Sequence, residues 1–155
     1  MTTESSSLPA ADGLMDVLLV EDNPGDVRLT REALRDVNRS VRLHVAVDGV
    51  QAMAFLNRTG AYELAPRPAL VLLDLNLPRL DGREVLGQIK ANKGLKTIQT
   101  VIVTTSDSSA DVLTSYRLRA NAYLRKPIEP DAFEDLVVSV NDDWLSRVSL
   151  PTQLA

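Results

Sequence analysis

The sequence contains no cysteine, one histidine and one tryptophan, and aromatic residues make up only 4% of its 155 residues. Without cysteine there is no disulfide framework, no thiolate nucleophile and no cysteine-based metal site. No basic run stands out in a chain of net charge -4, so we expect no nucleic-acid binding. No run approaches the roughly 18 apolar residues of a membrane span, and no signal peptide is recognisable. These absences favour a cytoplasmic protein without membrane contact.

The remaining composition is that of an ordinary globular domain, with 45% hydrophobic and 25% charged residues. A chain of this length suits one domain, which can bury a sizeable core without a metal or disulfide. The Ser/Thr-rich start, residues 1–13, is predicted to be a disordered lead. We expect the folded domain over residues 14–148 and a short tail over residues 149–155.

Hydrophobic periodicity divides the chain into five strand–helix units. The predicted strands are residues 16–20, 41–47, 69–74, 100–105 and 121–125. The predicted helices are residues 26–37, 48–60, 82–92, 109–120 and 129–149. Asp26 is a candidate cap for the first helix.

The alternation of strands and helices predicts an α/β fold with helices on both faces of a parallel sheet. The runs at 16–20, 69–74 and 100–105 are apolar throughout, as in central strands, whereas those at 41–47 and 121–125 alternate, as in edge strands. The predicted fold is therefore a flavodoxin-like (βα)5 doubly wound sheet with strand order 2-1-3-4-5.

The chemistry-bearing residues follow the predicted strands, at the sheet edge where sites form in open parallel sheets. They comprise three carboxylates, two adjacent hydroxyls and one amine: Glu21, Asp22, Asp74, Thr104, Thr105 and Lys126. Clustered carboxylates repel one another, and a bound divalent cation removes that repulsion.

Mg²⁺ is the predicted cofactor, because it prefers oxygen ligands and takes one or two protein carboxylates. We expect Asp22 and Asp74 as direct ligands, the main-chain carbonyl of Asn76 as a third, and Glu21 acting mainly through water. Asp74 would then attack a phosphoryl group with its other oxygen, while Lys126 and Thr104 help to neutralise the phosphoryl oxygens.

Four segments, "LLVEDN", "LLDLNLPRLDG", "VIVTTS" and "AYLRKP", resemble in order the signature segments of response-regulator receiver domains from two-component signalling. The resemblance covers residues 16–147. It implies Asp74 as phosphoacceptor, Thr104 as switch hydroxyl with Thr105 as the alternative, Lys126 as phosphate contact and Tyr123 as switch aromatic. It also implies a sensor histidine kinase as partner and a cis bond before Pro127.

A narrower resemblance concerns the loop "NRTGAYELAPRP" and the segments "PRPALVLLDLNLP" and "DDWLSRVSLP". These are similar to small stand-alone regulators paired with phytochrome-type histidine kinases. The implied function is a single-domain response regulator, phosphorylated on Asp74 with Mg²⁺, that signals through protein contacts and has no DNA-binding output domain. It would be a switch, not a metabolic enzyme.

Three other functional classes fit the sequence less well. A phosphohydrolase with an aspartate nucleophile needs a second acid two residues later, where this chain has Asn76. A pseudo-receiver without phosphorylation conflicts with the intact acidic, hydroxyl and lysine set. A nucleotide-binding fold lacks its glycine-rich motif, since neither G-x-G-x-x-G nor a P-loop occurs.

The last predicted helix carries an apolar stripe beyond the length that the core needs. Partial core packing and a partner interface both fit Trp144 and Leu145. We expect a symmetric homodimer with an interface of Trp144, Leu145, Val148 and Leu150. Tyr123 can likewise be a switch or simple packing. His44 is expected to be a surface histidine on the polar face of its strand, with no metal-ligand partner spaced to it and no role as an internal phosphodonor.

Overall fold

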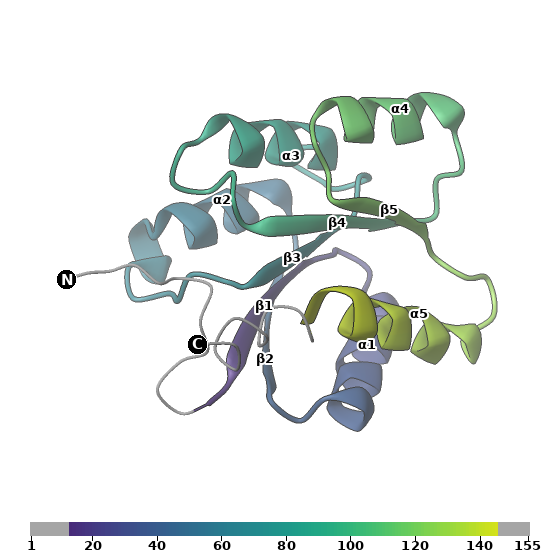
Figure 1. Cartoon of the computed structure of the whole chain (residues 1–155). Coiled ribbons are helices and arrows are strands. Elements are labelled where there is room, and N and C mark those ends of the chain that lie inside the picture. Colours follow the sequence, from purple (N-terminus) through teal and green to yellow (C-terminus); the bar gives the residue numbers. More distant parts are fainter. Residues whose placement is uncertain (1–12, 146–155) are drawn as a thin grey trace.

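The computed structural model describes residues 13–145 and contains five strands and five α-helices (Figure 1). The strands are β1 (Met15–Val20), β2 (Val41–Ala46), β3 (Leu70–Leu73), β4 (Gln99–Thr104) and β5 (Ala122–Arg125). The α-helices are α1 (Pro24–Val37), α2 (Gly49–Asn57), α3 (Gly82–Ala91), α4 (Ser109–Arg117) and α5 (Ala132–Val140). A 3-10 turn, Gly60–Tyr62, follows α2. Apart from Gly13, the predicted lead and tail lie outside the described residues.

The sheet is parallel with strand order β2-β1-β3-β4-β5, which confirms the predicted flavodoxin-like topology. Every residue of β1 and β3 is buried, whereas β2 and β5 are mostly half-buried. A strand buried on both faces must be apolar throughout, and a strand at the sheet edge keeps one wetter face. The contrast between these runs therefore separates the central strands from the edge strands, as the predicted order requires.

Helices cover both faces of the sheet (Figure 1), with α2, α3 and α4 on one side and α1 and α5 on the other. Alternate residues of β1 face opposite layers. Leu18 and Val20 pack in the core under α2 and α3, while Val17 and Leu19 pack in the core under α1 and α5. The two cores hold the strands rigidly, so the strand ends form a fixed platform.

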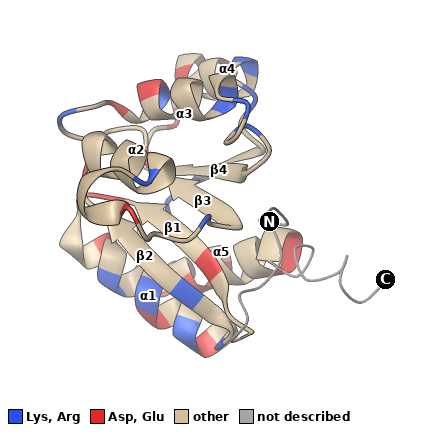
Figure 2. Ribbon diagram, turned by 90° about the vertical axis from the view of Figure 1, so that its left-hand side faces the viewer, with Lys and Arg blue, Asp and Glu red and all other residues tan. Residues whose placement is uncertain are grey.

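The surface mixes charges of both signs, and α1 carries basic and acidic residues side by side (Figure 2). Within the described range 13–145, no helix combines the length and apolar character that crossing a membrane requires. On the face that Figure 2 shows, the basic residues are interspersed with acidic ones and do not form a continuous stripe.

The start of α1 differs from the prediction. The helix begins at Pro24, and its N-cap is Asn23, whose side-chain oxygen accepts a 3.1 Å hydrogen bond from the main-chain nitrogen of Asp26. Asp26 is therefore not the cap. Proline suits the first turn because its missing N–H would have no partner there.

The end of α5 also differs. The α-helix starts at Ala132 instead of residue 129 and continues as a π-helical turn over Asn141–Leu145. Leu145 is fully buried in the core under α1 and α5, so the expectation that its side chain is exposed was wrong. Trp144 is half-buried and packs against the same core. Val148 and Leu150 lie outside the described residues.

His44 is half-buried and contacts a carboxylate, although it was predicted to lie at the surface. Its Nε2 lies 2.8 Å from Oδ1 of Asp16, a buried carboxylate on β1. Nε of Arg42 donates a 2.7 Å hydrogen bond to the same oxygen. Asp16 lies opposite Arg42 in the parallel pair β1–β2, so these contacts join the edge strand β2 to the central strand β1.

Gly82 brings the start of α3 against the loop that follows β3. A Cβ atom at this position would lie 2.1 Å from the main-chain oxygen of Asp74, closer than any side chain tolerates. The main-chain nitrogen of Gly82 also donates a 2.9 Å hydrogen bond to the carbonyl of Leu75. Only glycine permits this close approach of two backbones.

Candidate functional site

Asp74 follows β3 directly, and its side chain is held from both oxygens. Oδ1 accepts hydrogen bonds from Oγ1 of Thr104, at 2.8 Å, and from the main-chain nitrogen of Asn76, at 3.2 Å. Oδ2 accepts a 2.8 Å hydrogen bond from Nζ of Lys126. The residue is only 7% exposed. Three donors therefore hold this carboxylate in one orientation at the end of β3, and the bond from Asn76, two residues later, also closes an Asx-type turn.

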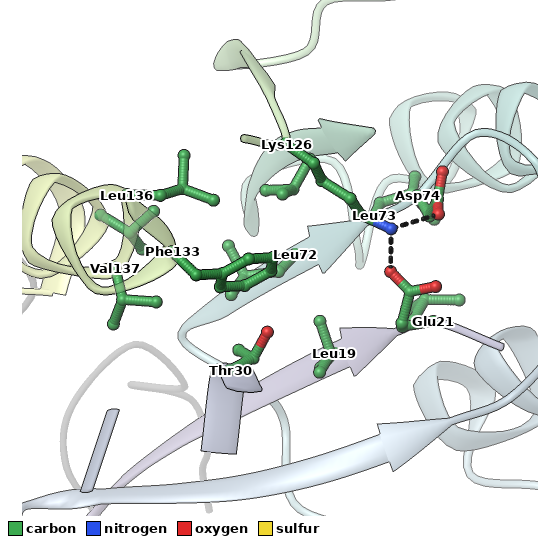
Figure 3. A pocket seen from close by; sticks show the side chains of 13 residues that line it. Leu19, Glu21, Thr30, Leu72, Leu73, Asp74, Lys126, Phe133, Leu136 and Val137 are labelled. Atoms are coloured by element: carbon green, nitrogen blue, oxygen red, sulfur yellow. Dashed lines mark hydrogen bonds and ion pairs between the residues drawn. The ribbon is translucent and has the colours of Figure 1, made fainter. Parts of the chain in front are cut away.

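Lys126 brings the end of β5 to the same place. Its main-chain nitrogen bonds to the carbonyl of Thr104 at 2.8 Å, and its ammonium group lies among the carboxylates of Glu21, Asp26 and Asp74. Figure 3 shows the side chain reaching between Glu21 and Asp74. Burial alone would lower the pKa of Lys126, but the hydrogen bonds that its ammonium group donates to Asp74, Glu21 and Asp26 outweigh burial and hold the pKa above its ordinary value.

Glu21 and Asp22, at the end of β1, complete an acidic group with Asp74. Each of the three offers a carboxylate oxygen, and these oxygens lie within 4.8 Å of one another. Glu21 is buried and Asp22 is exposed. Burial raises the pKa of Glu21 to about 7 against the opposing effect of Lys126, and the charge of Asp74 adds to the rise. One ammonium group does not offset this negative charge, so the site fits an added cation.

The structure decides between the two threonines. Thr104 is fully buried with its hydroxyl on Asp74, whereas Thr105 is exposed and lies outward. Tyr123 is half-buried, and its hydroxyl donates a 2.8 Å hydrogen bond to the carbonyl of Ser106. Tyr123 thus contacts the loop after β4 as well as packing against the core.

The bond before Pro127 is trans, since the described residues contain no cis peptide. This corrects the cis bond that the family resemblance implies. A trans bond before proline is the lower-energy form by about 0.5–1 kcal/mol in the absence of other constraints.

The loop after β4 is held by a charged network that was not predicted. Asp111, in the first turn of α4, accepts a 2.6 Å hydrogen bond from Oγ of Ser106 and a 2.7 Å bond from Arg83 of α3. Arg83 also pairs with Asp81, the N-cap of α3. The network ties the starts of α3 and α4 to the segment that carries Thr104.

Asp26 is the site residue that sequence reasoning missed. Its Oδ2 lies 2.9 Å from Nζ of Lys126. The available signal was its position: α1 starts immediately after the acidic pair, so the first turn of α1 lies beside the strand ends.

The main-chain carbonyl of Asn76 stays a predicted metal ligand. The contact that the structure gives for this residue is the hydrogen bond from its main-chain nitrogen to Asp74.

A small cavity of about 20 Å³ lies behind Glu21, Asp74 and Lys126 (Figure 3). Its other walls are apolar and include Leu19 and Phe133. This volume holds about one water molecule, far less than the space that a small organic substrate requires. The functional groups instead face the edge of the sheet.

The geometry matches one family over most of the chain. Residues 17–138 match the response regulator receiver domain. The chain belongs to this family. Its sequence is 47% identical to that of the response regulator Rcp1 of Synechocystis sp. over 135 residues, which cover 87% of this chain and 92% of Rcp1. It is 37% identical to the probable methanogenesis regulatory protein FilR2 of Methanothrix harundinacea, over 92% of this chain and 91% of FilR2.

Solved receiver structures show the same fold. The Mn²⁺-bound form of Rcp1 superposes with a TM-score of 0.81 at 46% identity, over 84% of this chain and 94% of Rcp1. The phosphorylated cyanobacterial phytochrome response regulator RcpA superposes with a TM-score of 0.84 at 41% identity, over 86% of this chain and 96% of RcpA. The chain is thus a response regulator of the two-component class.

Proposed function

We propose that this receiver domain accepts a phosphoryl group on Asp74 from a phosphohistidine of a sensor kinase and signals through protein contacts. The observation that carries the proposal is the arrangement around Asp74, where Thr104 and Asn76 bind one oxygen and Lys126 binds the other. A carboxylate held in one orientation next to an ammonium group is prepared for attack on phosphorus.

In the transfer, a carboxylate oxygen of Asp74 forms a bond to phosphorus while the bond between phosphorus and the histidine nitrogen breaks. The electron pair of that bond returns to the imidazole, and the product is an acyl phosphate on Asp74. Lys126 and the hydroxyl of Thr104 are within reach of the new phosphoryl oxygens because both already contact the carboxylate. Their role is to orient the acceptor and stabilise charge that develops in the transition state.

The acidic group suits a divalent cation, and we propose Mg²⁺. Glu21, Asp22 and Asp74 supply only oxygen atoms, the ligands that Mg²⁺ prefers, and the exposed Asp22 leaves room for water ligands. When bound, the cation neutralises the charge of the incoming phosphoryl group. The Mn²⁺-bound form of Rcp1 supports divalent binding in a similar protein. We assign the main-chain carbonyl of Asn76 as a further ligand.

We propose a phytochrome-type histidine kinase as the partner, because RcpA is a phytochrome response regulator and similar in sequence and fold. A kinase makes phosphohistidine from ATP, so the exchange belongs in the cytoplasm. We expect no metabolic reaction beyond phosphoryl transfer and slow hydrolysis of the acyl phosphate. A phosphohydrolase is disfavoured because Asn76 stands where its second acid would be.

The test is single-site labelling by a phosphorylated kinase, or by acetyl phosphate, with Mg²⁺. Asp74→Asn should abolish labelling and keep the fold, since the side chains are nearly the same size. Asp81→Asn is the matched control: Asp81 lies in the same loop and caps α3, and asparagine is also a good cap. The control should be labelled normally. Labelling that persists in Asp74→Asn would remove Asp74 as the acceptor.

A further inference from the structure

The three N–H groups of Lys126 have one carboxylate partner each. A lysine ammonium group offers three donors, and here they bind Glu21, Asp26 and Asp74. The side chain of Lys126 is only 5% exposed, whereas that of Asp26 is 24% exposed. The contact therefore joins a buried ammonium group to a carboxylate at the rim of the site, and solvent screens it less than an exposed pair.

The three partners differ in what the reaction requires of them. Asp74 becomes an acyl phosphate, so its carboxylate no longer carries its own charge. Glu21 belongs to the acidic group whose oxygens lie close enough to share one cation. Among the described acidic residues, Asp26 is the contact of Lys126 that neither accepts phosphoryl nor belongs to that group.

We infer that Asp26 is a positioning residue for phosphoryl transfer, which keeps Lys126 at Asp74 while the other two partners change their roles. The inference rests on the proposed function, since it concerns the same acceptor. Asp26 sits in the first turn of α1, which Asn23 caps and fixes. A rigid helix turn therefore provides the anchor, and Lys126 needs only small movements to exchange a carboxylate oxygen for a phosphoryl oxygen.

Without Asp26, one N–H of Lys126 loses its partner, and the ammonium group is drawn toward Glu21 and Asp22. A displacement of about 1 Å in a catalytic geometry costs as much as about a hundredfold in rate. Because Glu21 and Asp74 still hold Lys126, we expect about a tenfold loss.

The experiment is a double-mutant cycle of wild type, Asp26→Ala, Lys126→Ala and the double variant. The phosphorylation rate is measured with acetyl phosphate at saturating Mg²⁺. Asp26→Ala should slow the wild-type protein about tenfold and should have no further effect in the Lys126→Ala background. Equal slowing in both backgrounds would overturn the inference, because Asp26 would then act without Lys126.

Two further variants separate positioning from charge and folding. Asp26→Glu should recover part of the rate, since a longer carboxylate still reaches Lys126. Asp36→Ala removes the same charge from the exposed face of α1, far along the helix, and should leave the rate unchanged. Slowing by Asp36→Ala equal to that by Asp26→Ala would show a general charge effect and overturn the inference.

The wild-type measurement keeps the two proposals apart. A wild-type protein that takes no label on Asp74 would contradict the proposed function itself. If the wild-type protein is labelled normally but the effects of Asp26→Ala and Lys126→Ala on the phosphorylation rate simply add, the proposed function stands and only the role of Asp26 is contradicted. Thermal unfolding of each variant checks that the compared proteins are folded at the assay temperature.

Discussion

Oγ1 of Thr104, the last residue of β4, donates a 2.8 Å hydrogen bond to Oδ1 of Asp74, which directly follows the neighbouring strand β3. The adjacent Thr105 lies just after β4 and is exposed. Burial and the contact with Asp74 therefore favour Thr104 as the hydroxyl that serves the acceptor. Two neighbouring residues of the same type make an internal comparison possible.

Thr104→Ala should slow phosphorylation of Asp74 by about tenfold or more, because it removes one positioned donor. Thr105→Ala should leave the rate within about twofold, since its side chain contacts solvent. The measurement is the initial rate of labelling with acetyl phosphate and Mg²⁺. Equal labelling rates in the two variants would show that the hydroxyl of Thr104 does not assist phosphoryl transfer.

Divalent cations should stabilise the folded protein by relieving repulsion among Glu21, Asp22 and Asp74. Binding only to the folded state adds about 2.7 kcal/mol at a concentration of about 100 times Kd. The melting temperature should rise with Mg²⁺, and Asp22→Ala should lose the rise without harming the fold because Asp22 is exposed. Glu32→Ala, which removes an exposed acid from α1, is the control and should keep the rise in melting temperature with Mg²⁺. An equal rise in all three proteins would indicate non-specific ion effects.

The network at Asp111 predicts a pH dependence of stability. The hydrogen bond from Ser106, and then that from Arg83, lower the pKa of Asp111 below its ordinary value. A carboxyl group whose pKa is lowered by folding contributes stability above its unfolded pKa of about 3.9 and loses it as the pH falls through the folded pKa. Asp111→Asn should therefore lower the free energy of unfolding at pH 7 by about 1 kcal/mol.

The difference in unfolding free energy between wild type and Asp111→Asn should shrink as the pH falls below about 4. The carboxyl is protonated there first in the unfolded state, and in the folded state only at the lower pH of its lowered pKa. Urea unfolding at several pH values measures this difference. Asp107→Asn is the control, because Asp107 pairs with Arg125 in an exposed contact with side chains 70% and 56% exposed. Its effect should stay below about 1 kcal/mol. A difference for Asp111→Asn that is constant down to pH 2 would contradict a charged role.

Homodimer formation remains a prediction that now centres on Trp144. Leu145 is buried in the monomer, so its truncation would test the core and not an interface. Light scattering should show a dimer at micromolar concentration, and Trp144→Ala should weaken it by about 2 kcal/mol, or about thirtyfold. Leu64→Ala, at a side chain 93% exposed, is the control and should leave the dimer unchanged. A wild-type protein that stays monomeric at high concentration would assign Trp144 to core packing alone.

The strand ends were predictable from the sequence because a parallel sheet constrains them strongly. An apolar run such as Leu70–Leu73 can only be a central strand, and whatever follows it must lie at the carboxyl edge. Asp74, Thr104 and Lys126 were placed together on this basis, and the structure brings them into direct contact. The period of two along a strand leaves little freedom in where a side chain points.

Helical side chains were harder to place. A shift of two residues in the predicted start of a helix changes which residue is the N-cap and which residues lie in the first turn. The prediction began α1 at residue 26 instead of Pro24, and Asp26 was therefore read as a cap and not as a partner of Lys126. The π-helical turn that ends at Leu145 buries that residue for a similar reason, because its wider winding departs from the regular helical stripe.

Gly82 gives the acceptor loop a property that matters for signalling. Since its main chain lies directly against the backbone of Asp74 and Leu75, this side of the acceptor has no free space to move into. The opposite side is the loop after β4, held by side-chain contacts at Ser106 and Tyr123 that are able to exchange. Under the proposed phosphorylation of Asp74, a change of shape would therefore be directed toward the loop after β4, α4 and β5. The close contact at Gly82 would make the start of α3 the fixed support for that movement.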